Sequence, residues 1–163
     1  MFDAFSSRSR IVVFVARLVA GERGSTTIDA GDLLVGLIHE DQGAHGSMLS
    51  KFSGGEGAVS RFPASTHKNF FDPTIATELL TSIEESLQHQ EPIPPWIEIP
   101  LSDGLTRVFE AAESYRNQFQ QKQVEPLHLL AAILNDQGSV ASRELLSAGI
   151  IQEEVFESLQ GLD

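Results

Sequence analysis

An internal repeat constrains this chain more than any other feature of its sequence. Residues 29–43 and 125–138 carry the same pattern, and Leu33 in the first copy aligns with Leu129 in the second, an offset of 96 residues (129 − 33). Each copy begins with a polar or acidic residue suited to a helix N-cap and ends at glycine. Apolar residues at positions i, i+1, i+4 and i+5 form one stripe of a buried helix. The pattern therefore predicts a duplicated helical unit.

The segments that flank each copy also show helical spacing, which predicts an all-α fold. Ser6 and Ser102 each precede such a segment as candidate N-caps, and Ala16 and Ala112 keep the offset of 96 residues. A shorter helix is expected after the first copy, at residues 44–52. Each half then contains four helices, so we expect an eight-helix bundle made of two tandem four-helix pseudo-repeats.

A chain of 163 residues is long enough for one compact domain and short for two independent cores. We therefore expect a single domain over residues 1–163. Its parts are repeat 1 at about residues 1–87 with an inserted loop at 53–71, a connector at 88–101, and repeat 2 at about 102–163.

The insert and the connector are the two segments without helical spacing. The insert is rich in glycine, and we expect Phe70 and Phe71 to attach its far end to the core. The connector contains four prolines, which force an extended or polyproline-like path. Trp96 lies between these prolines, and the sequence leaves two roles open for it: a plate on which a peptide docks, or a cap over the core.

Composition excludes several classes of function. The chain has no cysteine, so disulfides and thiolate metal sites are impossible, and we expect a cytoplasmic location. A formal net charge of −12 argues against a nucleic-acid partner, because phosphate binding needs a basic surface, and it favours basic partners. No apolar run approaches the ~20 residues that a membrane span needs, and the N-terminus does not resemble a signal peptide.

Catalytic motifs are also absent. The sequence has neither a phosphate-binding loop nor the elbow of a serine hydrolase. His39, Glu40, Asp41 and His45 suggest a small metal-assisted hydrolase, but residues six apart do not share a helix face as the histidines of a zinc-protease helix do. We therefore expect no enzyme activity, no metal and no cofactor. His128 lies beside the apolar stripe and is interpreted as a structural histidine.

Four stretches together resemble a known family. They read Phe-Ser-x-Arg at residues 5–8, Leu-Leu-x-Gly-Leu-Ile at 33–38, Val-Glu-Pro-Leu-His-Leu-Leu at 124–130, and Val-Ala-Ser-Arg-Glu-Leu-Leu-Ser-Ala-Gly-Ile at 140–150. With them the chain resembles the N-terminal repeat domain of Clp-type AAA+ unfoldases, over almost its whole length except the insert. The first half fits less well, because Asp32 stands where the family has histidine.

The resemblance implies a non-catalytic protein-binding module. In the unfoldases this domain receives adaptors or substrates above the ATPase ring. A free-standing copy is expected to be an accessory or adaptor factor whose partners are Clp ATPase or peptidase components, adaptors or substrates. The candidate partner-binding residues are Trp96, Phe70, Phe71, Ser6 and Ser102. A ligand-sensing domain that uses the groove between the repeats remains an alternative.

The resemblance also bears on one ligand. Some domains of this family bind phosphorylated arginine, and a glutamate just before the histidine of the second helix holds the guanidinium. The matching positions here are Gly31 and Leu127, whose side chains accept no hydrogen bond. We therefore expect that phosphoarginine is not bound tightly and that partners use another surface, near Trp96 or the insert.

Overall fold

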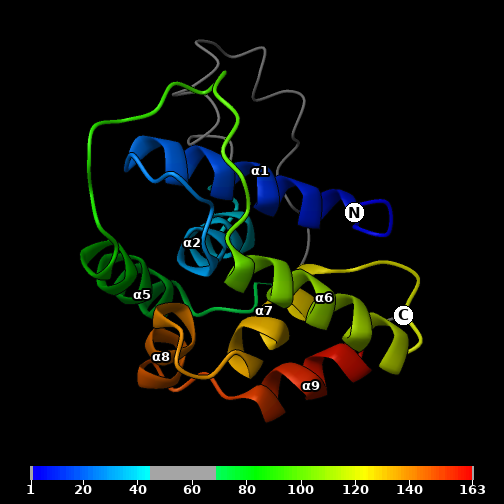
Figure 1. The fold of residues 1–163 in the computed structure, drawn as a ribbon. Coiled ribbons are helices and arrows are strands. Elements are labelled where there is room, and N and C mark those ends of the chain that lie inside the picture. Colours follow the sequence, from blue (N-terminus) through cyan, green and yellow to red (C-terminus); the bar gives the residue numbers. More distant parts are fainter. Residues whose placement is uncertain (1, 45–68, 163) are drawn as a thin grey trace.

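The computed structural model describes residues 2–44 and 69–162, and within these ranges the fold is all-α. Seven helices pack around one hydrophobic core, and the described ranges contain no β-strand (Figure 1). None of these helices is long and apolar enough to cross a membrane. The all-α class predicted from the sequence is confirmed. The helices are α1 (Ser7–Glu22), α2 (Ala30–Asp41), α5 (Pro73–Ser86), α6 (Asp103–Gln118), α7 (Pro126–Asn135), α8 (Val140–Ser147) and α9 (Gln152–Gln160).

Two sequence-based expectations fall mostly outside the described residues. They are the short helix expected at residues 44–52 and the insert expected at residues 53–71. Of these two segments, only Ala44 and residues 69–71 are described. The eighth helix of the expected bundle therefore stays a prediction.

Helices α1 and α6 begin and end at equivalent positions of the two halves. Each has 16 residues, and both boundaries are displaced by the same 96 residues that separate the repeated motifs. The Ser6 hydroxyl accepts the backbone N–H of Ser9 (3.2 Å), and the Ser102 hydroxyl accepts that of Leu105 (3.1 Å). Both serines are therefore N-caps, as the sequence predicted.

Two isolated parallel β-bridges join the halves in a reciprocal way. Phe5 pairs with Val124, and Leu101 pairs with Ile28. Leu101 is the counterpart of Phe5, and Val124 is the counterpart of Ile28, each 96 residues later. The two bridges are therefore equivalent in the two halves. Each half thus places the residue before its first helix beside the start of the other half's second helix, which is the relation expected of a duplicated unit with pseudo-two-fold symmetry.

The repeated helices α2 and α7 lie at the centre and contact each other. Leu33, Leu37, Leu129 and Ile133 are all buried, as the apolar stripe predicts. Around this pair, α5 contacts both α2 and α8, and α9 contacts α7. Figure 1 shows the same arrangement, with α1 across α2 and with α6 and α9 beside α7. The core is therefore built on the repeated motif.

Candidate protein-binding surface

The connector carries a tight turn with Trp96 near its apex. The carbonyl oxygen of Pro94 accepts the N–H of Ile97 at 3.1 Å, which closes the turn. Pro95 occupies the second position, where its fixed φ favours turns. Trp96 follows at the third position and is 82% exposed. The structure therefore excludes the role of core cap for Trp96. Residues 94–97 are called the Trp96 turn below.

Arg17 of α1 stabilises the Trp96 turn by hydrogen bonds to its backbone. Its Nη2 group donates to the carbonyl oxygens of Pro94 (3.1 Å) and Pro95 (3.2 Å) and also to that of Ile97. Partial burial lowers the pKa of Arg17, and an arginine guanidinium stays charged in proteins. Charge-assisted hydrogen bonds are stronger than neutral ones, so Arg17 fixes the backbone that presents Trp96.

Two glycines let the connector lie directly on the end of α1. Ile93 donates its N–H to the carbonyl oxygen of Gly21 at 2.7 Å. A Cβ at Gly24 would lie 2.3 Å from the carbonyl oxygen of Glu91, and Gly24 has a positive φ of 74°. In Figure 1 the green connector crosses over α1 on its way to α6. The Trp96 turn is therefore part of a packed segment.

Phe70 and Phe71 attach the chain to α2, as the sequence predicted. The Asp41 carboxylate accepts both of their backbone N–H groups, at 2.7 Å and 3.0 Å. Their rings form an edge-to-face pair with centroids 5.3 Å apart. Phe71 is buried and Phe70 is half-buried. Their burial shows an anchoring role, and a direct contact with a partner stays a prediction.

These two phenylalanines line a cleft of about 210 Å³ between the halves. Its walls come from α1 and α2 on one side and from α7 on the other, and most of the lining side chains are apolar. This is the groove between repeats that the ligand-sensing alternative requires. The lining residues are Arg8, Leu37, Asp41, Phe70, Phe71, Pro126, Leu127, Leu130 and Leu162.

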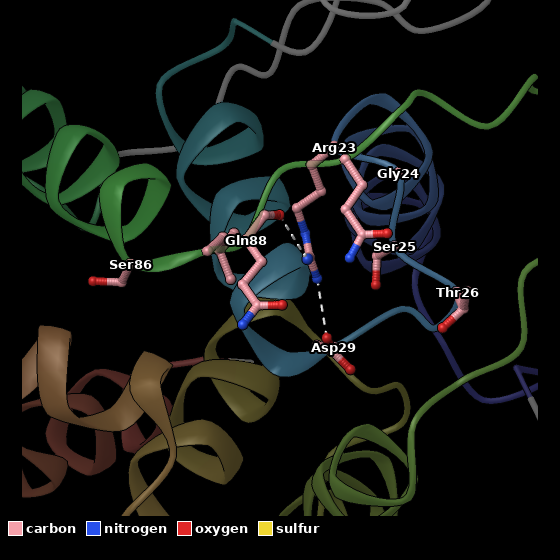
Figure 2. A pocket seen from close by; sticks show the side chains of 9 residues that line it. Arg23, Gly24, Ser25, Thr26, Asp29, Ser86 and Gln88 are labelled. Carbon is pink, nitrogen blue, oxygen red and sulfur yellow. Dashed lines mark hydrogen bonds and ion pairs between the residues drawn. The ribbon is translucent and has the colours of Figure 1, made fainter.

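A polar pocket of about 270 Å³ opens at the start of α2, and Arg23 forms one wall (Figure 2). Arg23 is only 7% exposed, and it binds the buried Asp32 through two hydrogen bonds of 2.7 Å and 2.8 Å. It also reaches Asp29 at 3.0 Å and the carbonyl oxygen of Gln88 at 3.3 Å. These bonds occupy the guanidinium within the protein. Arg23 could not be recognised from sequence patterns, because its partner carboxylates lie beyond a turn.

The two members of this ion pair affect each other's protonation. The hydrogen bonds to Asp32 raise the pKa of Arg23, although burial alone would lower it. Burial raises the pKa of Asp32, and the bonds from Arg23 counteract that rise. An unpaired carboxylate at this depth would be costly, so Arg23 is what allows Asp32 to be buried as an anion.

Comparison with known proteins identifies the fold. Residues 72–148 match the family model of the Clp repeat (R) N-terminal domain. Over these residues, just under half of its length, the chain is similar to the Clp N-terminal repeat domain. The match covers α5 to α8, the part of the chain where the sequence motifs are also strongest. No curated protein sequence matches the chain significantly.

Three solved structures share the fold of this chain. The N-terminal domain of the caseinolytic protease associated chaperone ClpD from Arabidopsis thaliana is 17% identical, with a TM-score of 0.64, covering 99% of this chain and 95% of that chain. The Hsp104 N-terminal domain from Candida albicans is 18% identical, with a TM-score of 0.59 and coverages of 96% and 89%. A chain described under structural investigations of a malarial protein secretion system is 15% identical, with a TM-score of 0.69 and coverages of 97% and 93%. These likenesses concern the fold.

The other candidate residues of this chain fall into two groups. Ser6 and Ser102 have their hydroxyls engaged as helix caps, so their proposed contact with a partner stays a prediction. The metal-site candidates lie at the end of α2, where Glu40 forms an ion pair with Arg8 at 2.8 Å. His45 lies outside the described residues. Within residues 2–44 and 69–162, no group of three His, Asp or Glu side chains could hold a metal ion.

Proposed function

We propose that this chain is a non-catalytic protein-binding module that acts as an accessory or adaptor factor of a Clp protease or chaperone system. The observation that carries the proposal is the exposure of Trp96 on a turn fixed to α1. Its partners would be Clp ATPase or peptidase components, adaptors or substrates. The cytoplasmic location expected from the sequence stays a prediction.

An exposed tryptophan on a fixed backbone is suited to binding. Tryptophan is enriched among the residues that dominate protein interfaces, because it buries a large apolar area and retains a polar N–H. The three bonds from Arg17 and the fixed φ of Pro95 order the turn before any partner arrives. A partner therefore has little loop-ordering entropy to overcome.

The proposal is tested by affinity capture from the native cell, with the bound proteins identified by mass spectrometry. The bait is the full chain, compared with a Trp96→Ala variant and a Leu146→Ala variant. Leu146 is also a large exposed apolar residue, at 49%, but it lies on α8 far along the chain from the connector. We expect Clp components or their clients on the unmodified chain and on Leu146→Ala, and their loss from Trp96→Ala.

An Arg17→Met variant adds a test of the fixed turn. It keeps Trp96 but removes the bonds to the three carbonyl oxygens, so we expect weaker capture of the same proteins. Capture of the same proteins at the same level by Trp96→Ala would reject the proposal. Circular dichroism would show that the variants remain folded, which is expected because the Trp96 side chain is mostly in solvent.

A ligand-sensing domain is a second candidate, favoured by the cleft between the halves. Its volume of about 210 Å³ and its mainly apolar lining suit a small molecule with an apolar body. Native mass spectrometry of the protein from its own cell would detect such a ligand. A Leu127→Trp variant, which fills the cleft from the half-buried Leu127, should lose the added mass; a protein that carries no added mass would remove this candidate.

A further inference from the structure

The connector combines an exposed indole with negative charge and contains no cation of its own. Glu91 and Glu98 are its only charged residues, and both are exposed. Neither forms an ion pair within the described part of the chain. Arg17, the cation behind the turn, directs its Nη2 group to three backbone carbonyl oxygens. The outer side of the connector is therefore aromatic and acidic.

Glu98 is placed to act together with Trp96. It follows Trp96 by two residues, and both side chains are exposed while Ile99 is buried. Glu98 is the first residue after the Trp96 turn, so its exposed carboxylate lies within two residues of the exposed indole. A long cationic side chain of a partner can therefore reach both groups.

We propose that the Trp96 turn binds an arginine-bearing segment of a partner protein, with the guanidinium stacked on Trp96 and paired with Glu98. The inference rests on the proposed function, since it names the chemistry of the partner at the same surface. The net charge of −12 attracts a basic segment from a distance, and Glu91 extends this attraction along the connector.

Arginine fits this surface better than lysine or an apolar side chain does. Its guanidinium is planar and weakly hydrated, so it stacks on an aromatic ring while its N–H groups remain free to bind a carboxylate. Lysine carries a compact, strongly hydrated charge and lacks this stacking plane. An apolar side chain would cover the indole but leave the carboxylate of Glu98 without a partner.

The chain contains one tryptophan, so its fluorescence reports on this surface alone. The probes are three short peptides of glycine and serine that carry two arginines, two lysines or two glutamines at the same positions. Titrated into the full chain, the arginine peptide should change Trp96 emission with saturation and bind about two- to fivefold more tightly than the lysine peptide. The glutamine peptide should produce no saturable change.

Two matched variants separate the effect of the Glu98 carboxylate on peptide binding from the effect of the protein's net charge. Glu98→Gln should weaken binding of the arginine peptide, whereas Glu153→Gln should not, because Glu153 is an exposed glutamate on α9, outside the connector. Equal binding of all three peptides, equal loss in both variants, or no change in emission with any peptide would overturn the arginine assignment. The proposed function fails on a different result, namely cellular capture that does not depend on Trp96.

Discussion

Asp32 and His128 perform the same structural task in the two halves of the molecule, 96 residues apart. The Asp32 carboxylate accepts the N–H of Asp29, the N-cap of α2, at 2.9 Å. The Nδ1 atom of His128 accepts the N–H of Glu125, the N-cap of α7, at 2.8 Å. Both side chains are fully buried. One half therefore uses a buried anion where the other uses a neutral imidazole, and this difference determines which neighbours each half needs.

The anion requires Arg23. An Arg23→Met substitution leaves Asp32 buried without its cation, so we expect a loss of about 3–5 kcal/mol in the free energy of unfolding. The double variant Arg23→Met with Asp32→Asn should lose less than the sum of the single variants, because asparagine is neutral and can still accept the N–H of Asp29.

Urea unfolding of the four proteins in this double-mutant cycle measures the effect. Arg143 is exposed on α8, so Arg143→Met serves as the control and should change stability by no more than about 0.5 kcal/mol. A cost for Arg23→Met as small as that of the control would show that the buried pair is dispensable.

His128 makes stability depend on pH. Burial and the nearby charge of Arg116 lower its pKa from 6.5 to about 4. Between these two pH values the unfolded chain binds a proton at His128 and the folded chain does not. The free energy of unfolding therefore falls as the pH decreases from 6.5 to about 4. The stability that the neutral imidazole contributes is complete above pH 6.5, and by pH 5 the expected loss is about 2 kcal/mol.

The check is urea unfolding at pH 7 and pH 5 with two histidine variants. His128→Asn keeps an acceptor for the N–H of Glu125 but does not titrate, so this part of the loss should disappear. His89 is exposed, and His89→Asn should leave the loss unchanged. An NMR titration that gives His128 a pKa near 6.5 would contradict the prediction.

The two halves differ at the second residue after their first helix. Gly24 has a φ of 74°, and its counterpart Gln120 has a φ of 55°. A side chain is strained in this left-handed region, so Gln120→Gly should stabilise the protein by about 0.5–1 kcal/mol. Gly24→Ala should destabilise it by about 1–3 kcal/mol, because its Cβ would also meet the carbonyl oxygen of Glu91. Thermal unfolding of both variants measures the two opposite shifts, and shifts of the same sign would refute the argument.

Phosphoarginine is expected not to bind tightly. At Gly31 a Cβ would lie 2.7 Å from a methyl carbon of Leu87, so the first of the two family positions is covered as well as lacking a carboxylate. At the second position, Leu127 is half-buried and presents an apolar side chain to the cleft. Calorimetric titration with phosphoarginine decides the matter, and saturable micromolar binding would show that the residue transfer from the family is wrong.

Local features of the fold could be read directly from the sequence. Ser6 and Ser102 cap their helices as predicted. The structural role of His128 was also predicted. Each of these features depends on a few neighbouring residues, so helical spacing and the chemistry of capping are sufficient to specify it.

The candidate surface depended on contacts between distant parts of the chain. The sequence left the role of Trp96 open, because the backbone of its turn is bound by Arg17, which lies 77 residues before Pro94. It also gave no indication of the Arg23–Asp32 pair or of the reciprocal bridges at Phe5 and Leu101. Periodicity and capping specify each helix from within, whereas the position of a side chain on a connector depends on how separate helices meet, and only the packed tertiary structure determines that.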